Sequence, residues 1–314
     1  MRELSKKRRR FIRTLHLLRA KLMTDERLLK ILKSGKHTYG EISQRLGMKK
    51  SKVRRRIAKL RERGLNIRSE YTPQGNLVHY LQTEPEPAIP IDIPEASIIG
   101  ILSDTHLGNK YARPDKLRKF YDIAEKEGAE LFLHAGDLTD GDGKVYRGQL
   151  NELLVYGFDE TIDYVLKEYP RSSRKTYIIS GNHDDSFLKT VGADIIKAIC
   201  QEMEDMEYVG SVSARLKMGN KEIEIVHGSG GVPYARSYQS QKQLEQMAER
   251  PFLLIRGHLH ISLFMPYLES FVIEAGCFQE QTPYLKRKGL YPQVGGWILE
   301  IKGEKIRPYW VDLK

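Results

Sequence analysis

The chain has 314 residues, of which 40% are hydrophobic, 30% charged and 9% aromatic, a composition typical of globular proteins and enough for about two domains. It has no apolar run of the roughly 18 residues that a membrane span requires, and no apolar segment of a secretory signal follows its basic N-terminus. Only two cysteines, Cys200 and Cys277, are present, which excludes a disulfide framework, so we expect a cytoplasmic protein without a membrane partner.

The net charge of +11 is distributed unevenly along the chain. Residues 1–82 contain 24 Lys and Arg against 6 Asp and Glu, whereas the remainder contains 28 basic and 35 acidic residues. Basic side chains that merely solvate a helical face would give a similar excess. A basic head on a mildly acidic body nevertheless favours a polyanionic partner for the head, with nucleic acid as the leading candidate.

Three short helices are predicted at the start of the chain. A basic helix is expected over residues 1–23, and a second, with one apolar face, over residues 25–35. Thr38 and Glu41 have the spacing of a capping box, so they open the next helix, and Gly47 closes it.

A further helix is predicted over residues 52–64, with Ser51 as its N-cap, followed by a β-hairpin that turns at residues 73–76. This order of elements resembles a winged helix-turn-helix domain, whose last helix enters the major groove of DNA. The resemblance predicts contacts to duplex DNA from the basic helix, while RNA and protein partners stay open. The expected contact residues are Ser51, Lys52, Arg54, Arg55, Arg56 and Lys59.

Residues 83–95 contain four prolines, which is typical of a semi-rigid linker. We therefore expect a nucleic-acid-binding domain over residues 1–82 and a second domain over residues 96–314.

Five strand-like apolar runs in this second domain end in polar residues of the kind that bind metals. The residues at these ends are Asp104 and His106, Asp137, Asn182 and His183, His227, and His258 and His260. Nitrogen and oxygen donors suit divalent Mn, Fe, Zn or Co, and the absence of cysteine from the set excludes a zinc finger. The two Asp, the Asn and four of the His, without His183, make seven donors. This number exceeds what one metal usually takes from a protein, so the set predicts two metal ions that share a carboxylate.

The segments "SDTHLG", "GDLTD", "SGNHDD", "IVHG" and "RGHLH", in this order, resemble the metallophosphoesterase (calcineurin-like) superfamily over essentially all of residues 96–314. The resemblance implies an α/β fold in which two mixed sheets pack as a β-sandwich flanked by helices. It also implies two divalent ions, with Mn expected, and a water between them as the nucleophile. One ion would be held by Asp104, His106 and His260, the other by Asn182, His227 and His258, with Asp137 bridging both.

The family uses the histidine at position 183 as a general acid, so the resemblance implies that His183 protonates the leaving oxygen and that Asp184 orients its imidazole. We interpret Asp140, Asp142 and Asp185 as turn formers, surface charges or, for Asp185, a helix cap. His134 precedes its motif inside an apolar strand and reads as a core residue. Lys110, Tyr111 and Arg113 could reach a substrate phosphate.

These motifs predict hydrolysis of phosphate esters but do not identify the substrate. The linked basic head favours a DNA-directed phosphodiesterase, that is, a nuclease. The alternative is a DNA-binding regulator whose second domain hydrolyses or senses a small phosphate ester such as a cyclic nucleotide.

Overall fold

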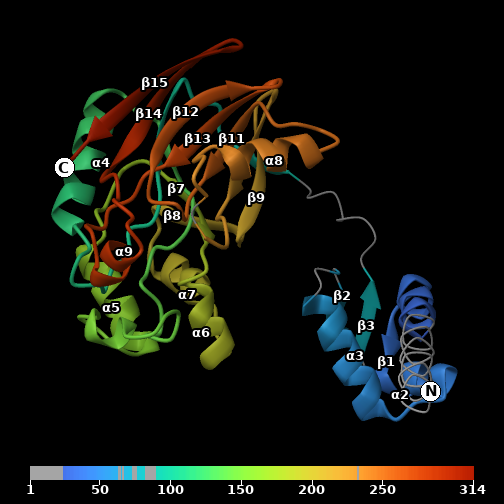
Figure 1. Ribbon diagram of the computed structural model, residues 1–314. Helices are drawn as coiled ribbons and strands as arrows, with labels where there is room; N and C mark the ends of the chain where they lie inside the picture. The colour runs from blue at the N-terminus through green and yellow to red at the C-terminus, as the bar shows by residue number, and fades with distance from the viewer. Residues whose placement is uncertain (1–23, 63–64, 66, 73–75, 82–89, 232) are drawn as a thin grey trace, which may run out of the picture. The chain divides into compact units, whose positions relative to one another are not determined.

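The computed structural model describes residues 24–62, 65, 67–72, 76–81, 90–231 and 233–314 (Figure 1). The chain divides into two compact units, residues 1–87 and residues 88–314, which we call the head and the body. The predicted basic helix over residues 1–23 lies outside the described residues. Within the described part of the chain, no helix combines the length and the apolar character that crossing a bilayer requires.

The head has the predicted helices and hairpin around one small core. Residues 24–33 are helical, and the remaining elements are β1 (His37–Thr38), α2 (Tyr39–Leu46), α3 (Lys50–Glu62), β2 (Ile67–Tyr71) and β3 (Leu77–Leu81). The strands form a sheet in the order β1-β3-β2, with antiparallel pairing. The core is made by apolar side chains that recur on one face of each helix: Leu28, Leu32, Ile42, Val53, Ile57 and Leu60.

The helix boundaries in the head follow local hydrogen bonds. The capping box is confirmed, since Thr38 Oγ1 accepts from the Glu41 amide at 3.3 Å and the Thr38 amide donates to Glu41 Oε2 at 2.7 Å. Gly47 ends α2 in the left-handed region, at φ 61°. The prediction that Ser51 caps the next helix is wrong, because α3 already begins at Lys50 and Ser51 lies in its first turn.

The first sheet of the body has the strand order β15-β14-β5-β6-β7-β8. Its parallel strands are β5 (Ile98–Leu102), β6 (Leu131–His134), β7 (Thr176–Ser180) and β8 (Met206–Ser211). At one edge, β14 (Gly295–Lys302) runs antiparallel to β5, and β15 (Lys305–Asp312) completes the sheet.

The second sheet has the order β12-β13-β11-β10-β9-β4. Its strands are β4 (Ile91–Ile93), β9 (Ser213–Met218), β10 (Lys221–Val226), β11 (Leu253–Arg256), β12 (Ser262–Tyr267) and β13 (Ser270–Ala275). Here β10, β11 and β13 are parallel neighbours. Residues 91–93 fall within the predicted linker but form β4 instead, because Ile93 is buried against the sandwich core.

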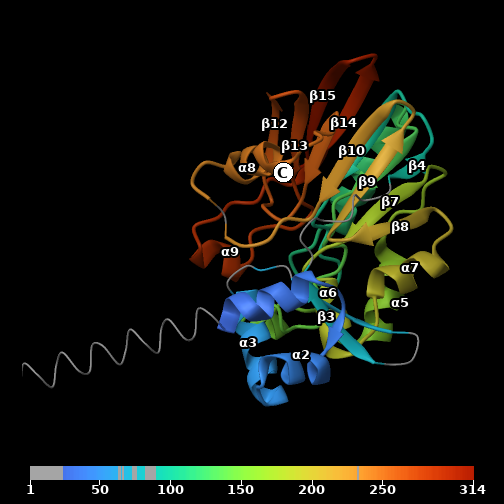
Figure 2. The ribbon, with the colours of Figure 1, turned by 90° about the vertical axis from the view of Figure 1, so that its right-hand side faces the viewer.

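The two sheets pack face to face, and helices cover their outer faces (Figures 1 and 2). Alternate side chains of both sheets form the apolar core between them, including Ile99, Leu133, Ile225 and Ile255. The helices are α4 (Pro114–Lys126), α5 (Phe158–Glu168), α6 (Asp185–Thr190), α7 (Ile195–Glu202), α8 (Tyr238–Gln246) and α9 (Pro283–Arg287), with a short 3₁₀ helix at Gln149–Asn151.

The outer face of the first sheet packs against α4, α5 and α7, and Leu244 of α8 packs on the outer face of the second. This arrangement is the predicted class of fold: two mixed sheets in a sandwich flanked by helices. It also places the carboxyl ends of parallel strands from both sheets at the same end of the sandwich, where side chains beyond each strand can meet.

Candidate metal centre

Five strand ends bring their polar residues together at this end of the sandwich. Asp104 and His106 follow β5, Asp137 follows β6, and Asn182 and His183 follow β7. From the second sheet, His227 follows β10, and His258 and His260 follow β11. The side chains come from segments up to 154 positions apart in the sequence, yet they line one cavity of about 230 Å³ or lie directly beneath it.

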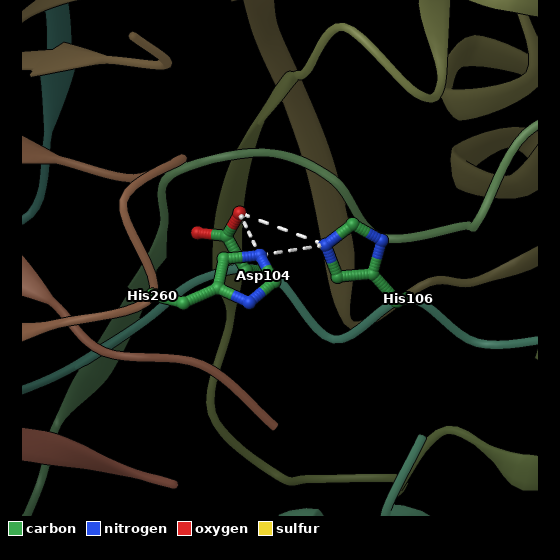
Figure 3. A group of neighbouring side chains, drawn as sticks. All are labelled: Asp104, His106 and His260. Atoms are coloured by element: carbon green, nitrogen blue, oxygen red, sulfur yellow. Dashed lines mark hydrogen bonds and ion pairs between the residues drawn. The ribbon is translucent and has the colours of Figure 1, made fainter. Parts of the chain in front are cut away.

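One group of donors contains Asp104, His106 and His260 (Figure 3). The two imidazoles approach each other through their Nε2 atoms, which are 3.0 Å apart, and Asp104 Oδ1 lies 3.2 Å from His260 Nε2 and 3.7 Å from His106 Nε2. Figure 3 shows the three side chains pointing toward one another, Asp104 and His106 from the segment after β5 and His260 from the segment after β11. Their ligand atoms are therefore close enough to bind one ion.

A second group contains Asp137, His227 and His258. Asp137 Oδ2 lies 3.1 Å from His227 Nε2 and 3.9 Å from His106 Nε2 of the first group. Its carboxylate therefore stands between the two groups. Asn182, which the family resemblance assigns to this second group, lines the same cavity.

Hydrogen bonds on the far side of each imidazole fix which nitrogen faces the centre. His106 Nδ1 donates to Asp140 Oδ1 at 2.9 Å, and His227 Nδ1 donates to the Ala135 carbonyl at 2.7 Å. Both rings are thereby left with Nε2 as the ligand atom. His258 has the opposite arrangement: its Nε2 donates to the Gly230 carbonyl at 2.9 Å, so Nδ1 remains as its ligand atom. Such outer partners are usual for metal-binding histidines.

The backbone at the strand ends is held in uncommon conformations. Seven non-glycine residues of the described chain have positive φ, and five of them are predicted ligands: Asp104, His106, Asp137, His258 and His260, with φ from 45° to 81°. Bonds between loops maintain them, such as those from the Asp104 amide to the Gly136 carbonyl and from the His106 amide to the Asp137 carbonyl. Strained backbone concentrated in this way is typical of functional sites.

Gly181 is required by close packing rather than by a positive φ. A Cβ at this position would lie 2.1 Å from Asp137 Oδ1 and 2.4 Å from the Asp137 amide nitrogen. Only glycine lets the β7 loop approach the Asp137 carboxylate, where the His183 amide donates to Oδ1 at 2.8 Å.

The donors suit positively charged ligands. Burial alone would lower the pKa of both His227 and His106. The Asp137 carboxylate nevertheless raises the pKa of His227 to about 9. At His106, Asp104 and Asp140 outweigh burial and raise the pKa well above its usual value. The centre thus favours positive charge. In addition, Asn182 Oδ1 is buried without a hydrogen-bonding partner among the described residues, which an oxygen-seeking cation would satisfy. Divalent ions therefore fit the residues that are present.

The predicted pairing of Asp184 with His183 is wrong. The Asp184 carboxylate accepts from the amides of Leu138, Thr139 and Gly181 and from the Thr139 hydroxyl, at 2.8 to 3.2 Å. It joins the loops after β6 and β7, and burial together with the charge of Asp137 raises its pKa to about 6.

His183 takes its partners from the β6 loop instead. Its Nδ1 donates to the Asp140 carbonyl at 3.0 Å, and Asp140 Oδ1 lies 3.4 Å away. The interpretation of Asp140 as a turn former or surface charge is therefore wrong, because its carboxylate is buried and contacts both His106 and His183. Asp185 does not cap α6 either, since its Oδ1 accepts from Ser180 Oγ at 2.9 Å.

His134 is a core residue, as predicted. It is fully buried in β6, accepts a hydrogen bond from the Gly136 amide at 3.2 Å, and burial lowers its pKa to about 3. Asp142, interpreted as a turn former or surface charge, is also buried, and its carboxylate accepts from the Lys144 amide at 3.1 Å, as in a turn.

Sequence reasoning missed one wall of the cavity. This wall comes from the loop after β6 and from α9 with its flanks: Tyr146, Tyr284, Leu285, Lys288 and Leu290. None of these residues directly follows a strand and no regular spacing links them, so no local pattern in the sequence brings them together.

In the head, α3 exposes most of the predicted DNA contacts. Ser51, Lys52, Arg54, Arg55 and Lys59 are exposed. Arg56 differs, because its guanidinium forms an ion pair with Asp25 and is partly buried. The predicted DNA contact of Arg56 is therefore not supported, because Asp25 already neutralises its charge.

Comparison with known proteins agrees with this fold and these motifs. Residues 98–262 match the model of the calcineurin-like phosphoesterase family, and because the match covers more than half of the chain, the protein belongs to that family. Residues 24–65 match a winged helix-turn-helix DNA-binding model.

Among curated proteins, the chain is similar to the DNA polymerase II small subunit of Methanothermobacter thermautotrophicus, with 24% identity over 245 residues. The match covers 63% of this chain and 50% of the relative, so the chain spans about half the length of that protein.

Similar solved structures include an archaeal phosphodiesterase, with 18% identity, a TM-score of 0.42, and coverage of 68% of this chain and 99% of that one. A zinc complex of Vps29 from Entamoeba histolytica has 16% identity, a TM-score of 0.37, and coverage of 69% of this chain and 99% of the other.

Proposed function

We propose that the protein is a nuclease: a phosphodiesterase with two divalent metal ions that acts on DNA delivered by its winged-helix head. The observation that carries the proposal is that two donor groups meet at one cavity, with Asp137 Oδ2 within 4 Å of an imidazole nitrogen of each group, His227 Nε2 at 3.1 Å and His106 Nε2 at 3.9 Å. Two ions that share a carboxylate are the usual arrangement for hydrolysis of phosphate esters. The DNA-binding model matched by the head, and a relative that is a DNA polymerase subunit, support DNA as the substrate.

In this proposal, Asp104, His106 and His260 hold one ion, and Asn182, His227 and His258 hold the other, with Asp137 between them. The donors suit Mn, Fe, Zn or Co, and we propose Mn. When bound, such ions supply a water of lowered pKa and neutralise the charge of the phosphate. Asp140 holds His106 in the tautomer that presents Nε2. His183 lines the cavity and would transfer a proton to the leaving oxygen from Nε2, because Nδ1 is occupied by the Asp140 carbonyl.

The direct test supplies the full chain with Mn²⁺ and labelled linear duplex, nicked and single-stranded DNA, beside bis-p-nitrophenyl phosphate and cyclic nucleotides. We expect cleavage of at least one DNA form and of bis-p-nitrophenyl phosphate. Hydrolysis of cyclic nucleotides with no DNA cleavage would instead support the alternative, a DNA-binding regulator with a small-molecule phosphoesterase domain.

Replacing His183 by Ala is expected to lower kcat for a DNA strand by about 10²- to 10⁴-fold, the range for loss of a positioned proton donor. The loss for bis-p-nitrophenyl phosphate should be much smaller, because p-nitrophenolate leaves without being protonated. Elemental analysis should find the same metal content as in the wild-type protein. Equal losses on both substrates would contradict a proton-donor role for His183.

A further inference from the structure

A groove of about 790 Å³ continues from the catalytic cavity along the outside of the body. Tyr284 and Lys288 line both hollows, so the two share a wall. Four basic side chains line the groove: Lys110, Arg147, Arg287 and Lys288. Its acidic residue is Glu152, which is buried and accepts a hydrogen bond from the Tyr146 hydroxyl at 2.6 Å.

These four cations are exposed and have no carboxylate partner among the residues that the structure describes. Lys110 Nζ donates only to a backbone carbonyl, that of Asn151, at 2.8 Å. Neighbouring cations of the body are paired, as Arg113 is with Asp115 and Glu280. Because residues after 82 contain more acidic than basic side chains, an unpaired basic cluster beside the cavity indicates an anionic ligand.

An aromatic pair stands at the junction of the two hollows. The rings of Tyr146 and Tyr284 are stacked, with centroids 4.5 Å apart and planes 27° apart. Tyr146 also lies 6.1 Å from the His183 ring, and Lys288 Nζ lies 5.8 Å from the centre of the Tyr284 ring. Flat aromatic surface next to cations is the pattern that binds unpaired bases and their phosphates.

We propose that this groove is a subsite for an unpaired nucleic-acid strand: Arg147 and Arg287 bind phosphates next to the scissile one, and a base stacks on Tyr284. The inference rests on the proposed function and specifies its substrate as a strand with several phosphates rather than a single small ester. Lys110 retains its predicted phosphate role here. Arg113 loses it, because its guanidinium is held by Asp115 and Glu280.

The test measures inhibition of bis-p-nitrophenyl phosphate hydrolysis by the tetranucleotide (dT)₄ in the full-length chain. This readout reports binding at the body site whether or not the strand is cleaved. In the double variant Arg147→Gln/Arg287→Gln, the Ki of (dT)₄ should rise about 10- to 30-fold at about 0.1 M salt, since each lost single-strand phosphate contact changes the salt slope by about 0.7. The Ki of inorganic phosphate should not change.

The variant Tyr284→Leu tests the stacking of the base separately from the binding of the phosphates. It should raise the Ki of (dT)₄ but leave the Ki of an abasic tetranucleotide unchanged. The matched control is Arg174→Gln/Arg307→Gln, which removes two exposed arginines away from the groove and should behave as the wild-type protein.

Equal Ki values for (dT)₄ in the wild-type protein and the Arg147/Arg287 variant would overturn the groove proposal while the proposed function stands. A wild-type protein that hydrolyses no phosphodiester with Mn²⁺ would overturn the proposed function, and the groove proposal with it.

Discussion

Replacing Asp137 by Asn is expected to lower kcat for bis-p-nitrophenyl phosphate on the order of 10³-fold. The carboxylate lies within 4 Å of ligand nitrogens in both donor groups, at 3.1 Å from His227 and 3.9 Å from His106. The amide keeps the size of the side chain, and its oxygen can still accept from the His183 amide. The substitution removes the negative charge that two cations would share, and this loss costs about 4 kcal/mol of transition-state stabilisation.

The same Asp137→Asn protein should contain about one metal ion per chain or fewer after dialysis, whereas we expect about two in the wild-type protein. Elemental analysis measures this independently of activity. Asp163→Asn, an exposed carboxylate of α5, serves as the control and should match the wild-type protein in both measurements. Full activity together with full metal content in the Asp137 variant would rule out the shared-carboxylate site.

The second large effect concerns the head. Replacing both Arg54 and Arg55 by Gln is expected to weaken binding to duplex DNA between about 10- and 100-fold at about 0.1 M salt. Both side chains are exposed on α3, and two lost phosphate contacts should reduce the slope of log Kd against log salt by about 1.8. Fluorescence anisotropy over a salt series measures both quantities.

Arg171→Gln/Arg174→Gln is the matched control, because it removes two exposed arginines from the body. Hydrolysis of bis-p-nitrophenyl phosphate should be unchanged in the Arg54/Arg55 variant, since α3 belongs to the other compact unit. Unchanged DNA affinity and salt slope would refute α3 as the DNA-binding helix and favour a protein partner for the head.

Local features of the fold could be predicted because they depend on neighbouring residues. Thr38 and Glu41 cap α2 through bonds made within one turn, and Gly47 ends it. The start of α3 was predicted wrongly because a serine is tolerated in the first helical turn as well as at the N-cap. The strand β4 was not predicted because a proline-flanked segment forms a strand only where the edge of a sheet can pair with it.

The candidate ligands could be located because each one follows a strand, and parallel strands end at a common edge. The hydrogen-bonding partner of His183 could not be predicted, because Asp184 is its neighbour in sequence but does not contact its imidazole. Asp184 turns back to three loop amides, while Asp140 reaches His183 from the neighbouring strand end.

The sequence by itself determined the family motifs, the kinds of donor atoms and the strand ends that present them, because these depend on residue type and local spacing. The tertiary structure decided which donors share a group, that Asp137 stands between the groups, and that Tyr284 and Lys288 join the cavity to a basic groove. These contacts arise only when two sheets pack face to face and bring together residues more than 100 positions apart, which no local pattern encodes.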